Sequence, residues 1–563
     1  MKRLALLALF GLACVTRAEG PSAPVDADPP DAGAAAADME VAQGGQAFAG
    51  CTSDSQCSMD EICDGGVCVF SGAMFEAEPE KRVEVRDDRI FNTEAYDYTP
   101  ESALVSVADQ PLSTFSIDVD TASYSNMRRH LNEGYLPQPD AVRIEEMINY
   151  FSYDYPAPTG KDPFSVSAEI GPCPWNSDAE IVRIGLRGKP LPTEKLPPRN
   201  LVFLLDVSGS MDSPDKLPLL KRSMAMLTHQ LKERDRVAIA VYAGASGVVL
   251  PSTPGNEHAR ILAAIEGLSP GGSTNGAQGI ELAYQLATDG FAKRGINRIL
   301  LATDGDFNVG VTGRGELKRF IEDKRETGVA LSVLGFGTGN LKDSSMEQLA
   351  DVGNGNYAYI DSLVEAQRVL VEQAGGTFVT IAKDVKLQVE LNPSRIAEYR
   401  LIGYMNRRME THEFADDTKD AGEIGAGHTV TALYEIRRVA SGNAGTSAKP
   451  KLRYQGSRKQ TPAAAGDELM HVKIRFKPPQ GDKSTERTFP VADHKPPKPS
   501  DDFRFATAVA TFGLKLRHSP TTTKVTYDEI HTLAEAARGQ DPTGFRSELL
   551  TLIRLARDLD RTP

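Results

Sequence analysis

Three short segments of the chain carry oxygen-bearing side chains directly after apolar runs or in a glycine-rich turn. They are Asp206, Ser208 and Ser210 in the first segment, Thr274 in the second, and Asp304 in the third. Residues just past the ends of parallel strands converge at one edge of a sheet, so these side chains can meet. Two carboxylates and three hydroxyls suit a small, hard divalent cation. We expect Mg²⁺, with Mn²⁺ or Ca²⁺ as alternatives.

This donor set leaves room for a ligand from outside the chain. Mg²⁺ prefers a full octahedral shell and usually keeps several waters, so these groups do not fill its coordination sphere. An Asp or Glu carboxylate of a partner protein can replace a water and join the two proteins through the ion. The alternative is that the side chains only cap the helices that follow. Capping explains one segment at a time, whereas a shared cation explains all three.

Strands that alternate with helices must position these residues. From residue 200 to about residue 375, apolar runs of strand length alternate with helical patterns, which is typical of βαβ units around a parallel sheet. The sequence predicts strands at 201–205, 237–242, 299–302, 329–336 and 357–360. It predicts helices at 217–231, 258–268, 277–288, 316–327 and 364–373.

The regions on either side follow different patterns. Residues 114–120 alternate like a half-buried strand and helical patterns follow at 121–132 and 144–151, so we expect an α+β module at 100–195. After residue 383, alternating segments indicate an antiparallel sheet with one solvated face; they are 385–391, 429–436 and 470–476. The last predicted helices are 503–516, 527–537 and 545–558.

The N-terminus, residues 1–18, has the features of an export signal. Lys2 and Arg3 precede the apolar run 4–13, which is too short to cross a bilayer as a helix and ends at Cys14. The position of Cys14 resembles the lipidated cysteine of a bacterial lipoprotein signal, and an ordinary secretory signal is the alternative. We expect an exported, lipid-anchored protein at the outer membrane or cell surface rather than at the inner membrane.

A cysteine cluster at 49–70 lies between a flexible tether at 19–48, rich in Ala, Pro, Gly and Asp, and a charged linker at 71–99. The cluster consists of Cys51, Cys57, Cys63 and Cys68. In an exported chain it indicates a small disulfide-bonded module, and it lacks the paired C-x2-C elements of a zinc site. The sequence leaves the disulfide pairing open. Cys173 is left over, and we expect it to be buried beside Trp175.

Composition and missing motifs narrow the functional classes. The 563 residues are 40% hydrophobic and carry a formal net charge of −14, which argues against a nucleic-acid partner. There is no H-E-x-x-H, no G-x-S-x-G and no G-x-x-x-x-G-K-[ST] motif. Asp206 and Asp304 are both assigned as metal ligands, so no acid–base pair remains beside the metal. We do not expect an enzyme.

The motif set resembles a known type of metal site. D-x-S-x-S, a threonine after G-G-S, and T-D-G at a strand end are the pattern of the metal-ion-dependent adhesion site of von Willebrand factor type A domains. The resemblance implies such a domain at 198–376, built around a doubly wound parallel sheet.

Longer segments resemble bacterial lipoproteins of the YfbK type over about residues 95–563. They are STFSIDVDTASYSNMRRHLNEGYLP (113–137), VRIEEMINYF (142–151), NLVFLLDVSGSM (200–211), TDGDFNVG (303–310) and DAGEIGAGHTVTALYEIRR (420–438). This resemblance implies an N-terminal module, a central type A domain, and a C-terminal region at 377–563 with antiparallel strands followed by helices.

The expected function is metal-dependent protein binding at the cell envelope, by an anchored adhesion or scaffold protein. One alternative is a structural role in envelope assembly, in which the metal site is not essential. A second alternative is a hydrolase of envelope polymers, which would need a nucleophile or acid–base pair beside the metal.

Overall fold

The computed structural model describes residues 61–64, 67–70, 93–117, 120–272, 276–305, 314–373, 378–440 and 460–561. The chain divides into two compact units, Met1–Asp87 and Asp88–Pro563. In the first unit, β1 (Glu61–Asp64) and β2 (Val67–Phe70) pair as an antiparallel hairpin that places the backbone of Cys63 opposite Cys68. Cys14, Cys51, Cys57 and the side chains of Cys63 and Cys68 lie outside the described part of the chain, so the anchor and the disulfides stay predictions.

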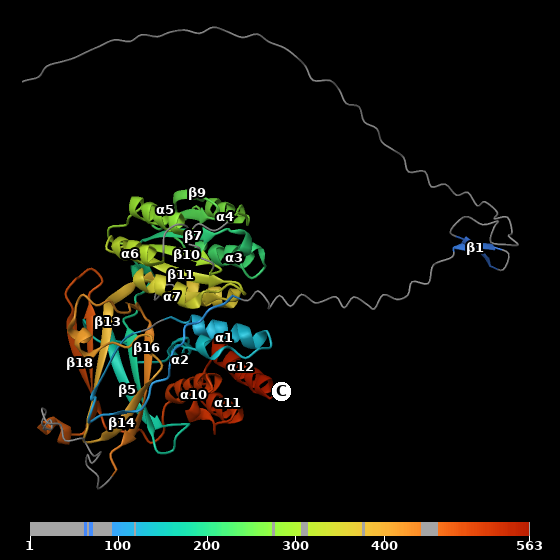
Figure 1. Cartoon of the computed structure of the whole chain (residues 1–563). Helices are drawn as coiled ribbons and strands as arrows, with labels where there is room; N and C mark the ends of the chain where they lie inside the picture. The colour runs from blue at the N-terminus through green and yellow to red at the C-terminus, as the bar shows by residue number, and fades with distance from the viewer. Residues whose placement is uncertain are drawn as a thin grey trace, which may run out of the picture. The chain divides into compact units, whose positions relative to one another are not determined.

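A six-stranded sheet, with strand order β12-β11-β10-β7-β8-β9, forms one layer of the second unit (Figure 1). Its strands are β7 (Arg199–Asp206), β8 (Arg236–Tyr242), β9 (Ser246–Pro254), β10 (Ile296–Thr303), β11 (Ala330–Phe336) and β12 (Tyr357–Ile360). The five predicted strands are present and parallel, and β9 pairs antiparallel to β8 at the edge. The sequence analysis missed β9, whose two prolines are tolerated only at an edge.

Helices cover both faces of this sheet, as expected for a doubly wound fold (Figure 1). They are α3 (Leu217–Thr228), α4 (His258–Glu266), α5 (Gly276–Asp289), α6 (Arg314–Arg325), α7 (Asp343–Val352) and α8 (Leu363–Gln367), which continues as a π-helical turn, Arg368–Glu372. Alternate residues of β7 enter two separate apolar clusters. Phe203 packs with Leu220 of α3 on one face, and Leu204 packs with Ile280 of α5 on the other.

Two further sheets form an antiparallel sandwich around one shared core. One sheet has the order β15-β13-β17-β18, with β4 also paired to β13, and the other has the order β3-β14-β16-β6-β5. The strands before the parallel sheet are β3 (Val105–Ser106), β4 (Leu112–Ser116), β5 (Phe164–Pro172) and β6 (Glu180–Gly188). Those after it are β13 (Thr380–Leu391), β14 (Ile396–Ile402), β15 (Ile424–Gly425), β16 (Thr429–Arg438), β17 (Glu468–Lys477) and β18 (Thr485–Ala492). The expected N-terminal module and C-terminal region therefore share both sheets.

A helical layer packs beside the sandwich and again combines both ends of the unit (Figure 1). It consists of α1 (Ala122–Asn132), α2 (Ile144–Asn149), α10 (Asp501–Leu516), α11 (Tyr527–Ala536) and α12 (Phe545–Asp560). These agree with the predicted helices to within about two residues. Cys173 is buried in the same apolar cluster with Trp175 against it, as predicted, and its thiol is free. Within the described residues, no helix combines the length and apolar character needed to cross a bilayer.

Candidate metal site

Two of the predicted ligands lie at the carboxyl ends of neighbouring strands. Asp206 is the last residue of β7, and Asp304 directly follows β10, which pairs with β7 in parallel. Both residues are almost completely buried. The hydroxyls of Thr303 and Tyr242 each donate to Asp206 Oδ2 over 3.1 Å. Thr303 is the first residue of the T-D-G segment but was not predicted to bond Asp206, and Tyr242 lies outside the motif.

The loop after β7 turns its two serines toward each other. The Ser208 N–H donates to Asp206 Oδ1 over 2.9 Å, and the Oγ atoms of Ser208 and Ser210 are 3.0 Å apart. Ser208 is buried, whereas Ser210 is exposed. The helix-capping alternative is wrong for this segment, since Ser208 makes no side-chain capping bond and α3 starts only after Lys216.

The glycine-rich turn that leads to Thr274 lies against this loop. The Gly271 N–H donates to the carbonyl of Val207 over 2.7 Å, and the Gly209 N–H donates to the carbonyl of Gly272 over 3.2 Å. Thr274 itself lies outside the described residues. Its place in the ligand set stays a prediction, which the position of Gly271 and Gly272 supports.

Asp206 and Asp304 are buried, so a nearby positive charge is required to stabilise their negative charges. Burial raises the pKa of Asp206 to about 6, the two hydrogen bonds from Ser208 oppose that rise, and the charge of Asp304 adds to it. Lys216 supplies one cation, with its Nζ 2.9 Å from Asp304 Oδ2. The stem of Lys216 crosses Gly337, whose φ is +74° and where a Cβ would collide with the lysine. The sequence motif gave no sign of Lys216.

The donor set fits a hard divalent cation. Asp206 and Asp304 provide carboxylate oxygens, and the buried Ser208 and the exposed Ser210 provide hydroxyl oxygens. No group of three or more His, Cys, Asp or Glu side chains gathers as metal ligands in the described part of the chain. The candidate site therefore depends on hydroxyls as well as carboxylates, which is the chemistry that the motif predicts.

Residues 93–95 form a strap that bonds the loop containing Gly339 and Lys342. This loop packs against the turn after Asp304. The Thr93 N–H donates to the carbonyl of Gly339 over 2.8 Å, and Glu94 Oε1 accepts from the Gly339 N–H over 2.9 Å. This loop closes on Gly305, which has a φ of +101° and would place a Cβ 2.6 Å from the Lys342 nitrogen. The sequence analysis assigned these strap residues to a linker, because their partners are more than 200 positions away.

Arg128 of α1 joins the helical layer to the same edge of the parallel sheet. Its guanidinium contacts Asp361, just after β12, over 2.5 Å, and Glu365 of α8 over 2.9 Å. It also contacts Glu548 of α12 over 3.1 Å. The Arg128 side chain is 3% exposed, so its pairs with Asp361 and Glu365 are interior, whereas Glu548 is partly exposed. The helices thus hold the edge that carries the candidate metal site.

Matches to known protein families agree with this architecture. The family described as von Willebrand factor type A domain matches residues 200–373, and one described as von Willebrand factor matches residues 90–183. The family described as uncharacterized protein YfbK, C-terminal, matches residues 376–559. Among solved structures, a von Willebrand factor type A protein from Catenulispora acidiphila covers 72% of this chain and 91% of its own, at 15% identity and a TM-score of 0.40.

Two curated relatives differ in how much of the chain they match. The uncharacterized protein sll0103 of Synechocystis is 30% identical over 186 residues, which is 33% of this chain and 43% of that protein. The uncharacterized protein YfbK of Escherichia coli K12 is 45% identical over 471 residues, which is 82% of this chain and 81% of that protein. The chain therefore belongs to the YfbK family and carries a von Willebrand factor type A domain at its centre.

Proposed function

We propose that this protein binds a partner protein at the cell envelope through a divalent cation in its type A domain. The observation that carries the proposal is the pair of buried carboxylates, Asp206 and Asp304, at neighbouring strand ends beside the hydroxyls of Ser208 and the exposed Ser210. Thr274 completes the proposed ligand set. Type A domains commonly bind protein partners, and the type A domain of this chain supports the same role.

The charges around the site favour an acidic group on the partner. Asp206 and Asp304 contribute two negative charges, a divalent cation contributes two positive charges, and Lys216 adds one more. The loaded site then carries one net positive charge, which an Asp or Glu side chain of the partner neutralises. This local charge has the opposite sign to the chain as a whole, which carries −14. Charge complementarity of this kind selects partners and speeds their encounter.

Different residues of the chain would bind the ion and orient its ligands. Asp206 and Asp304 hold the positive charge from the buried side, and the bonds from Thr303 and Tyr242 fix the orientation of Asp206. Ser210 marks the exposed rim. A cation held by these residues would act as a Lewis acid and would bind a carboxylate of the partner protein.

The proposal places this binding outside the cytoplasm. Its support is the export signal and Cys14, whose acyl chains would contribute about 0.8 kcal/mol per buried methylene to membrane anchoring. The structural alternative is an assembly role without a need for metal. Metal removal separates the two functions, because it abolishes partner binding only if the partner binds through the metal.

Partner capture from native envelopes tests the proposal. The full chain is crosslinked to envelope proteins in Mg²⁺ or in EDTA, with Asp206→Asn and Thr274→Ala beside the wild type. The matched control is Asp212→Asn, because Asp212 is an exposed carboxylate in the same loop. We expect a specific partner only for the wild type and Asp212→Asn, and only with Mg²⁺. Equal capture by Asp206→Asn, or capture in EDTA, would support the assembly role instead.

A further inference from the structure

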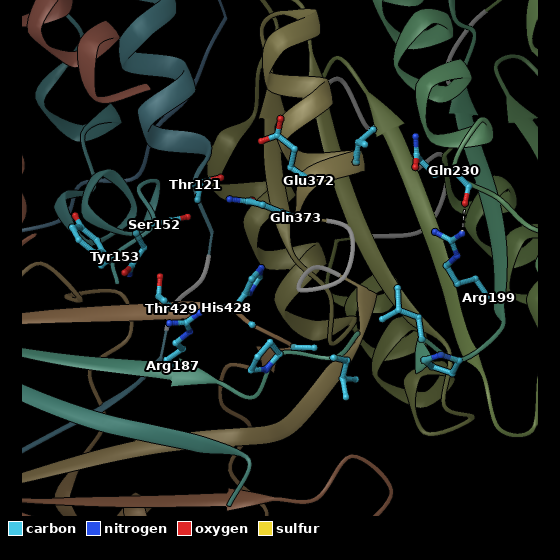
Figure 2. A pocket seen from close by; sticks show the side chains of 18 of the residues that line it. Thr121, Ser152, Tyr153, Arg187, Arg199, Gln230, Glu372, Gln373, His428 and Thr429 are labelled. Atoms are coloured by element: carbon cyan, nitrogen blue, oxygen red, sulfur yellow. Dashed lines mark hydrogen bonds between the residues drawn. The ribbon is translucent and has the colours of Figure 1, made fainter. Parts of the chain in front are cut away.

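A cavity of about 570 Å³ lies at the end of the parallel sheet away from the candidate metal site. Figure 2 shows side chains that line it. It reaches Arg199, the first residue of β7, whereas Asp206 is the last residue of that strand. At about 3.3 Å per residue, these positions are roughly 23 Å apart. The volume lies within the range of small-molecule sites, about 300–1,000 Å³. The cavity is therefore a separate place for a ligand.

Three regions of the fold form the walls of this cavity. The type A domain contributes Arg199 and Gln230, the sandwich contributes Arg187 and His428, and residues near α2 contribute Phe151 with its neighbours. Figure 2 shows Arg187, His428 and Thr429 together on one side and Arg199 with Gln230 on the other. A ligand between these walls would contact elements that are far apart in the sequence.

The wall from the sandwich offers donors that the protein does not use. Arg187 of β6 lies directly opposite Thr429 of β16 in the strand pairing, and His428 precedes Thr429. Arg187 Nη1 donates to the carbonyl of Tyr155 over 2.5 Å. Within the described residues, however, Arg187 Nε and His428 Nδ1 are buried and have no protein partner. Buried polar groups without partners cost free energy, so a small shift of these side chains that exposed the two nitrogens to the cavity would favour a polar ligand there.

Positive charge dominates the ionisable groups around the cavity. Arg199 is neutralised by Asp235 over 2.7 Å. Lys232 and Arg234 are exposed at the rim, and no ion pair of either is recorded in the described part of the chain. Arg187 has only Asp154 nearby, at 3.5 Å, and that carboxylate is 98% exposed. Among the described residues that line the cavity, Glu372 is the one exposed carboxylate.

The electrostatic environment of His428 indicates the same preference. Burial lowers the pKa of His428, the charges of Arg368 and Arg298 act in the same direction, and the resulting pKa is about 4. The imidazole is therefore neutral near pH 7 and can donate one hydrogen bond. The positive charges of Arg368 and Arg298, which are the smaller contribution to this shift, also favour a bound anion.

We propose that this cavity is a second binding site, which takes a small ligand through a phosphate or carboxylate group held by Arg187, His428 and Thr429. The guanidinium of Arg187 suits an oxyanion because its N–H groups can bind two oxygens at once. Lys232 and Arg234 attract the anion from the rim. The site is independent of the metal-dependent function, since it shares no residue with the candidate metal site.

Oxyanion titrations of the full chain test this site. Calorimetry in EDTA at constant ionic strength measures the binding of inorganic phosphate in one arm and citrate in the other, with chloride as the reference anion. We expect saturable binding of phosphate or citrate to the wild type. The anion that binds more tightly shows whether the site prefers a phosphate or a carboxylate group. Arg187→Gln and His428→Gln should each weaken that binding at least tenfold.

Matched variants separate a specific site from a general charge effect. Arg222→Gln removes a positive charge from exposed α3 and should leave binding unchanged. Lys232→Gln with Arg234→Gln changes only exposed side chains, so this variant should fold and should bind severalfold more weakly. Asp206→Asn should bind like the wild type. No saturable oxyanion binding to the wild type, or equal binding by wild type, Arg187→Gln and the Lys232/Arg234 variant, would overturn the proposal.

Discussion

Lys216 is the residue that most directly modifies the candidate metal site. Its amino group lies 2.9 Å from Asp304 Oδ2, so a cation bound at this site meets an existing positive charge. We expect Lys216→Met to bind divalent cations about tenfold more tightly, which corresponds to about 1.4 kcal/mol. Calorimetric titration with Mg²⁺ measures the change, and Lys221→Met on the neighbouring helix α3 is the control. Unchanged or weaker affinity would show that Lys216 does not oppose the cation.

Glu423 makes stability depend on pH. Burial raises its pKa to about 8, with Arg298 opposing and Asp384 and Asp420 adding to the rise. The pKa of Glu423 in the unfolded chain is about 4.3. Between about pH 4.3 and pH 8, the Glu423 carboxyl is therefore protonated in the native state but not in the unfolded state. The contribution of Glu423 to stability is thus full below about pH 4 and falls until about pH 8. Urea unfolding of Glu423→Gln should show a flatter decline over this range, and the exposed control Glu281→Gln should match the wild type. A Glu423→Gln curve parallel to the wild type would contradict the shift.

At the scale of elements, the loop held by the strap should set the position of Asp304. Gly305 and Gly339 both have positive φ, but a Cβ would collide only at Gly305, since Gly339 has open space around it. We expect Gly305→Ala to weaken Mg²⁺ binding more than tenfold and to lower the melting temperature. Gly339→Ala should cost only about 1–2 kcal/mol of stability and should keep the metal affinity. Equal metal affinity of the two variants would mean that this loop does not support the site.

The elements that the sequence predicted are those with strong local patterns. The parallel strands were recognisable because each is an apolar run buried on both faces, and α10 to α12 because their apolar residues recur at helical spacing. The edge strand β9 was missed because its prolines weaken the pattern. The pairing of β6 with β16 was also missed, since those strands are separated by the whole type A domain. Local periodicity contains no information about such distant partners.

At the scale of the whole molecule, residues before and after the type A domain build one support for it. Strands from both sides share each sheet of the sandwich. Arg128 joins α1 to α8 through a buried ion pair and to α12 through a partly exposed one. The spacing of the motif predicts Asp206, Ser208, Ser210, Thr274 and Asp304 as the metal ligands. The motif could not identify Lys216, the strap or the cavity at Arg187, because each depends on contacts between distant segments.

Binding of Mn²⁺ to the full chain tests the central claim most directly. Electron paramagnetic resonance counts free Mn²⁺ during titration of the wild type, Asp206→Asn and Asp212→Asn. We expect one saturable site in the wild type and in Asp212→Asn, competed by Mg²⁺, and a loss of at least a hundredfold in affinity for Asp206→Asn. If Asp206→Asn binds Mn²⁺ as tightly as the wild type, or if the wild type shows no saturable site, the metal site described here does not exist.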